Sequence, residues 1–144
     1  MSWVTPKTDW NGTTEDGVYI GDYFSAVDFN RIKNNLEYLR DETIQYFPSY
    51  DINSLGADRT YNDFFYADEI NQLEENLETI NANTFRLDIG MTREYYAYGP
   101  VMDFTELNRL ENATLRLYNK LQQMITSTDR YRRFIWNFGI GAEL

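Results

Sequence analysis

Residues 24–39 read FSAVDFNRIKNNLEYL, and residues 65–80 read FYADEINQLEENLETI. At an offset of 41 residues the two stretches share a phenylalanine, an alanine, two asparagines and a leucine. A weaker third copy, MDFTELNRLENATLRL, begins at Met102, a further 37 residues along the chain. Self-similarity of this kind is typical of one supersecondary unit repeated along a chain. The asparagine that all three copies share stands at Asn30, Asn71 and Asn108.

Each copy has the apolar spacing of an amphipathic helix. Apolar residues recur at alternating steps of three and four, which places them on one face of a helix that packs along its length. Ser25-x-x-Asp28 and Asp103-x-x-Glu106 fit capping boxes, in which a side-chain oxygen and an acidic residue satisfy the first backbone amides. The sequence therefore predicts helices over about residues 26–46, 67–81 and 104–125.

The fold class that we expect is mainly α, with three amphipathic helices from an internal repeat, long loops and extended aromatic arms. The loops, residues 47–64 and 82–102, are too long for a simple up-and-down bundle. The expected division is an N-terminal docking arm (1–24), a three-helix repeat domain (25–125) and a C-terminal extended segment (126–144). The helices could pack on each other or on those of neighbouring subunits, because their apolar faces permit both.

The composition argues against most enzyme classes. The chain of 144 residues contains no cysteine and no histidine, which excludes thiol nucleophiles, the usual catalytic triads and nearly all transition-metal sites. Its net charge of -10 would be repelled by nucleic acid and by anionic membranes. Residues 1–20 lack a basic segment followed by an apolar core, so no secretory signal is expected. We therefore expect no enzyme activity, no cofactor, no metal, and neither a nucleic-acid nor a membrane partner.

The acidic residues offer the remaining candidates for chemistry. Paired carboxylates could serve a hydrolase, but these acids are expected on solvated helix faces away from the apolar seam. The segment that begins at Asp51 resembles the start of a calcium loop, although Leu55 and Asn62 break the ligand pattern, so we interpret it as a turn. The candidate carboxylates are Glu37, Asp41, Glu74, Glu75 and Glu78.

Aromatic residues make up 17% of the chain, and several lie in the two arms. Such side chains suit protein–protein contacts, because their rings add buried area at low entropic cost. The alternative is that the arms pack back onto the helices of their own chain. The candidates for docking a partner are Trp3, Pro6, Trp10, Trp136 and Phe138.

Two further sets of residues have a candidate role. A side-chain amide at each repeated asparagine could bind the preceding arm and fix how the chain enters the helix, which is a structural task. Loop tyrosines could stack on the rings of a glycan, or they could simply pack. The tyrosines concerned are Tyr95, Tyr96 and Tyr98.

The string W-V-T-P-K-T-D-W at residues 3–10, followed by Y-F-S-A-V-D-F-N-R-I-K-N-N-L-E-Y-L at residues 23–39, resembles a known family. It is similar to the opening of tail and baseplate structural proteins of phages and prophages of Gram-positive bacteria, especially Firmicutes. That resemblance carries no catalytic residues. Residues 11–22 lengthen the arm relative to the family pattern, and no long fibrous or sugar-binding region follows the repeat.

The resemblance implies a non-enzymatic virion structural protein, a connector or adaptor of the tail or baseplate. Its partners would be other virion proteins and further copies of itself in a symmetric homo-oligomer. It would be assembled in the bacterial cytoplasm and reside in the phage tail. The alternatives are a glycan- or receptor-binding module that uses the loop tyrosines, a phage assembly factor, and a carboxylate hydrolase that acts on the cell wall.

Overall fold

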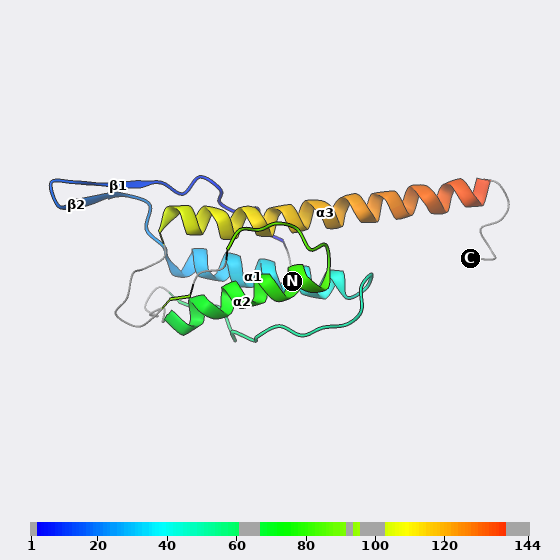
Figure 1. Ribbon diagram of the computed structural model, residues 1–144, viewed down its shortest axis with the longest axis horizontal. Coiled ribbons are helices and arrows are strands. Elements are labelled where there is room, and N and C mark those ends of the chain that lie inside the picture. The colour runs from blue at the N-terminus through cyan, green and yellow to red at the C-terminus, as the bar shows by residue number, and fades with distance from the viewer. Residues whose placement is uncertain (1–2, 61–66, 92–93, 96–102, 138–144) are drawn as a thin grey trace.

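The computed structural model describes residues 3–60, 67–91, 94–95 and 103–137, with side chains except those of Thr14, Tyr19 and residues 131–137. The fold is mainly α, as the repeat predicted, with three helices and a small two-stranded sheet (Figure 1). The elements are β1 (Gly12–Glu15), β2 (Val18–Gly21), α1 (Ala26–Thr43), α2 (Ala67–Asn83) and α3 (Phe104–Asn137).

The three helices run in the same direction, each starting at the end of the molecule that carries the hairpin (Figure 1). The chain must therefore travel back along the bundle after α1 and again after α2. It does so in extended stretches, and a third extended stretch precedes the hairpin. We call residues 3–10 the first extended segment, residues 50–59 the second, and residues 87–91 with 94–95 the third.

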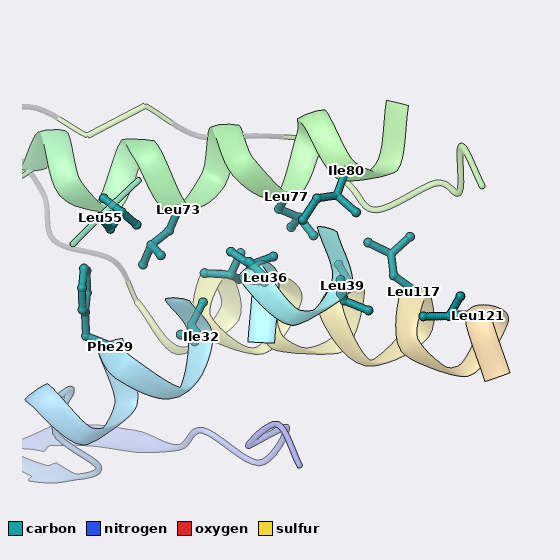
Figure 2. Packing of buried hydrophobic residues seen from close by; sticks show 12 residues of the cluster. Phe29, Ile32, Leu36, Leu39, Leu55, Leu73, Leu77, Ile80, Leu117 and Leu121 are labelled. Carbon is teal, nitrogen blue, oxygen red and sulfur yellow. The ribbon is translucent and has the colours of Figure 1, made fainter. Parts of the chain in front are cut away.

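The apolar faces of the three helices meet in one core inside a single chain. Figure 2 shows these side chains pointing toward one another from all three helices. Full burial of an aliphatic side chain contributes about 1.5–3 kcal/mol, so the core is the main source of stability. Ten helical side chains of the core are at most 1% exposed: Phe29, Ile32, Leu36, Leu39, Leu73, Leu77, Ile80, Leu110, Leu117 and Leu121.

The hairpin β1–β2 lies where the sequence was interpreted only as a lengthening of the arm. Its strands are antiparallel, and Thr13 pairs with Ile20. Asp16 and Gly17 form the turn with φ values of 51° and 77°, and a type I′ turn requires a positive φ at both central residues. The Asp-Gly dipeptide was therefore a readable hairpin signal that the sequence interpretation missed.

The helix ends differ from the expected ones, most of all in α3. α1 ends at Thr43, where the chain turns before Pro48, and α2 continues to Asn83. α3 continues to Asn137, so the expected extended segment at 126–144 is wrong as far as that residue. The helix continues through the Thr-Ser-Thr stretch at residues 126–128, and the Thr128 hydroxyl donates a hydrogen bond to the Met124 carbonyl within it, at 2.9 Å.

None of the helices in the described part of the chain combines the length and the apolar character needed to cross a lipid bilayer.

Candidate functional site: asparagine clamps and buried ion pairs

The shared asparagines hold the extended segments against the helices. The Arg59 N–H donates to Asn30 Oδ1 at 2.7 Å, and Asn30 Nδ2 donates to the Arg59 carbonyl at 2.9 Å. We call this two-bond pairing of one amide side chain with one backbone residue an asparagine clamp. It satisfies both backbone groups as a neighbouring β-strand would. The same clamp joins Asn71 to Tyr95 and Asn108 to Trp10.

The direction of these clamps corrects the expectation that each asparagine binds the preceding arm. Asn30 and Asn71 bind the segment that follows their own helix, because the chain returns along the bundle and passes the second turn. Asn108 binds the first segment, which lies 98 residues earlier. The asparagines therefore position whole segments along the bundle rather than the entry to a helix.

A second set of clamps lies five residues further along α1 and α2. Asn35 pairs with the backbone of Val4, and Asn76 pairs with that of Asn53, with bonds of 2.7–2.9 Å. Both asparagines are at most 2% exposed. The signal was present in the sequence, because Asn35 and Asn76 match within the repeat, but no role was assigned to them. The third copy has Ala113 at this position.

The clamps give the bundle an approximate threefold repeat. Clamped residues are six apart in the first segment, Val4 and Trp10, and six apart in the second, Asn53 and Arg59. The first segment lies between α1 and α3, and the second lies between α1 and α2. The third lies between α2 and α3, where Arg116 donates to the Asp88 carbonyl. Each groove between two helices thus holds one extended segment.

Ion pairs at matching repeat positions link the helices beneath these segments. Arg31 of α1 binds both carboxylate oxygens of Glu111 on α3, at 2.7 and 3.0 Å. Arg109 of α3, which matches Arg31 in the repeat, binds Glu74 of α2. Glu74 and Glu111 are each 1% exposed. The expectation of a solvated acidic face is therefore wrong for Glu74.

Glu74 was misjudged because neighbouring elements, not its own helix, bury it. It flanks the seam residue Leu73, and Arg109 covers it from α3. Burial raises the pKa of the Glu74 carboxyl above its ordinary value of 4.5, while the hydrogen bond from Arg109 opposes that rise. Because the partner of the Glu74 carboxyl is Arg109 of the neighbouring helix α3, we assign this carboxyl a structural role.

The first segment also forms hydrogen bonds with Glu111, the carboxylate that Arg31 binds. The Lys7 N–H donates to Glu111 Oε1 at 3.0 Å, and the Trp10 indole N–H donates to Oε2. Trp3 stacks on Tyr118 with ring centroids 4.1 Å apart. Trp10 is 4% exposed.

These contacts decide between the two alternatives for the arm. Pro6 is buried, as Trp10 is, and Trp3 packs against the core. The three arm residues expected to dock a partner therefore pack on their own chain. The same contacts correct the arm at 1–24, because its residues 3–10 belong to the helical domain. Trp136 lies within α3 but its side chain is outside the described set, and Phe138 lies outside the described residues.

The remaining candidate residues are the loop tyrosines and the calcium-like stretch that begins at Asp51. Tyr95 is 6% exposed, so its ring is not presented to a glycan, while Tyr96 and Tyr98 lie outside the described residues. The calcium-like stretch is part of the second extended segment. Within the described ranges, no group of three or more acidic side chains is placed to hold a metal ion.

No protein-family model, curated protein or solved structure matches this chain.

Proposed function

We propose that the chain is a non-enzymatic virion structural protein, a connector or adaptor of a phage tail or baseplate. The observation that carries the proposal is the shape of the molecule. A clamped bundle carries two projecting elements, the hairpin at one end and the second half of α3 at the other (Figure 1). Two projections on a braced body suit a part that joins neighbours in an assembly.

The use of polar residues supports the same proposal. Asparagines and ion pairs inside the bundle bind backbone groups or each other, so their chemistry is directed to holding the fold. The resemblance of residues 3–10 and 23–39 to tail and baseplate proteins supplies the context. The partners would be other virion proteins and further copies of this chain, assembled in the bacterial cytoplasm.

Under this proposal the surfaces that contact neighbouring proteins differ from the two arms expected from the sequence. The first extended segment is occupied in bracing its own bundle, so the hairpin and the second half of α3 take the role expected of the two arms. A glycan-binding module is less well supported, because the ring of Tyr95 is buried.

Quantitative mass spectrometry of gradient-purified tailed particles from the source host tests the proposal. We expect peptides of this chain at a fixed ratio to the major tail protein. If the chain is abundant in infected cells and absent from particles, it is an assembly factor or a cellular binding module, and the proposal is wrong.

A further inference from the structure

The second half of α3 extends past the other two helices. In the repeat, the last residue of α1, Thr43, corresponds to Leu121, and the last residue of α2, Asn83, corresponds to Lys120. Met124 and Ile125 still pack against the core, but the helix then continues to Asn137. We call residues 126–137 the helix extension. No described helix of this chain lies beside it (Figure 1).

Two features of the helix extension suit it to binding another surface. The steps of three and four that bury Leu117 and Leu121 continue through positions 128, 131 and 135, which hold threonine, tyrosine and isoleucine. The helix extension also contains three arginines and one aspartate, a net charge of +2. Since the whole chain carries -10, the remainder carries -12. The helix extension is thus a basic helix on an acidic protein.

The hairpin at the opposite end has the complementary character. Its register places Thr13, Glu15, Val18 and Ile20 on one side of the sheet, which we call the hairpin face. Val18 is 62% exposed and Ile20 is 53% exposed. Residues 9–22 contain four acidic residues and no lysine or arginine. Lys7 pairs with Asp9 and Asp22, which leaves Glu15 and Asp16 at the turn to give the hairpin its negative charge. Exposed apolar side chains therefore lie within a locally acidic segment.

We propose that the helix extension of one copy binds the hairpin face of a second copy, head to tail. In this contact the exposed Val18 and Ile20 meet the helix extension, and the negative charge of the hairpin attracts the net positive charge of the helix extension. This proposal deepens the structural role proposed above and rests on it, since it names the partner as the same chain.

Charge favours this arrangement over symmetric pairing. Two helix extensions repel each other because both are basic, and two hairpins repel each other because both are acidic. The two surfaces lie at opposite ends of the long axis (Figure 1), so one molecule cannot close the contact on itself. A head-to-tail contact between different surfaces produces a ring when its rotation closes and an open chain when it does not.

Sedimentation velocity on the full chain tests the proposal first. We expect the mean mass to rise with protein concentration at low salt and to fall when salt is added, because exposed charges are screened. A monomer at every concentration and at both salt levels would overturn the proposal.

Two charge-reversed variants test which surfaces meet. The tail variant is R130E/R132E/R133E, and the head variant is T13K/E15K. Each alone should associate at least about tenfold more weakly than the unmodified chain. An equal mixture should associate again, because the acidic head of one variant meets the basic tail of the other. If the head variant associates normally, or the mixture stays monomeric, the helix extension does not bind the hairpin.

The control variant E75K/N112K has the same charge change as the head variant, on exposed positions of α2 and α3. It should associate as the unmodified chain does, and melting curves should show that all three variants are folded. The outcome is separable from that of the particle experiment. A chain found in particles at a fixed ratio but monomeric alone would contradict the head-to-tail contact and leave the structural role standing.

Discussion

The first and third extended segments occupy equivalent grooves but are held in different ways. The first is joined to α1 through the hairpin, and it is clamped by Asn35 and Asn108 and bonded to Glu111. The third is joined to helices at both ends. Ala113 replaces the asparagine that would clamp it from α3, but α2 clamps it twice, Tyr95 through Asn71 and Leu87 through Asn81. A segment tethered at both ends loses less entropy on docking, so its bonds have less entropy to offset than those of the first segment.

The largest loss of stability should come from replacing the two buried glutamates. Glu111 bonds the first segment directly, and Glu74 bonds Arg109, which in turn bonds the third segment. Glu111 accepts hydrogen bonds from Arg31, Lys7 and Trp10. E111A leaves the buried Trp10 indole N–H without its acceptor and leaves the partly buried Arg31 guanidinium with Asp28 alone, so it should lower the free energy of unfolding by about 3–5 kcal/mol. Urea denaturation measures this loss.

The matched variant is E74A. Its loss should be smaller, because among the described residues only Arg109 donates a hydrogen bond to Glu74, and the Oε2 atom of Glu74 has no hydrogen-bond partner there. E75A, at an exposed position of α2, should change stability by less than about 0.5 kcal/mol. Equal losses for E111A and E74A would show that the bonds from the first segment to Glu111 add nothing to stability.

The clamps should give the next largest effect. N108A and N71A each remove two hydrogen bonds to a backbone residue, so each should cost about 2 kcal/mol. The variants should differ in what becomes mobile. With N108A the first segment can leave its groove, and hydrogen exchange should accelerate at Trp10.

In N71A the third segment stays tethered at both ends, so exchange should increase only around Tyr95. N108D is the conservative control, because it keeps the acceptor and loses the donor, and its effect should be intermediate. Equal acceleration along both segments would mean that tethering is unimportant.

A smaller effect is expected from restoring the missing clamp. In the repeat register, position 113 faces the backbone of Ile89, whose carbonyl accepts a hydrogen bond from Arg109 instead. A113N should raise the free energy of unfolding by about 1 kcal/mol, measured by urea denaturation. The reference is N76A, which removes the equivalent clamp and should lower it. A destabilised A113N would show that the third groove is too narrow for the clamp.

The smallest effect should be a pH dependence at Glu74. Its pKa in the folded protein lies above the ordinary value of 4.5 because of burial, so the folded state binds the proton more tightly than the unfolded state. This contribution to stability is complete below 4.5 and is lost as the pH rises through the folded pKa.

Compared with E74Q, the unmodified chain should therefore gain stability as the pH falls from neutral to about 5. Urea denaturation at several pH values measures the difference, with E75Q as the control at an exposed carboxyl. Parallel curves for E74Q and the unmodified chain would exclude a titration of Glu74 in this range.

The sequence predicted the parts of the fold that depend on local pattern. The spacing of apolar residues identified three helices, and the repeat singled out Asn30, Asn71 and Asn108 before their contacts were known. The course of the extended segments could not be predicted in the same way, because the clamps of the repeated asparagines join residues 23 to 98 positions apart. The burial of Glu74 is likewise set by α3, which contributes Arg109 from 35 residues away.

The end of α3 was misjudged for a different reason. The predicted end at about residue 125 lies just before Thr-Ser-Thr, but threonine and serine are only moderately unfavourable in a helix, and no glycine or proline follows in the helix before Gly139. The Thr128 hydroxyl finds its acceptor inside the helix.

The groove of the first extended segment has a consequence for how the protein is made. One wall of that groove is α1 and the other is α3, so residues 3–10 are synthesised about a hundred residues before their binding site is complete. On the ribosome, α1 and α2 of the nascent chain can pack together with the second segment between them, while Trp3 and Trp10 remain exposed to solvent. We therefore expect closure of the first segment, the longest loop to form, to be the last step of folding, and this protein to fold more slowly than its helix content suggests.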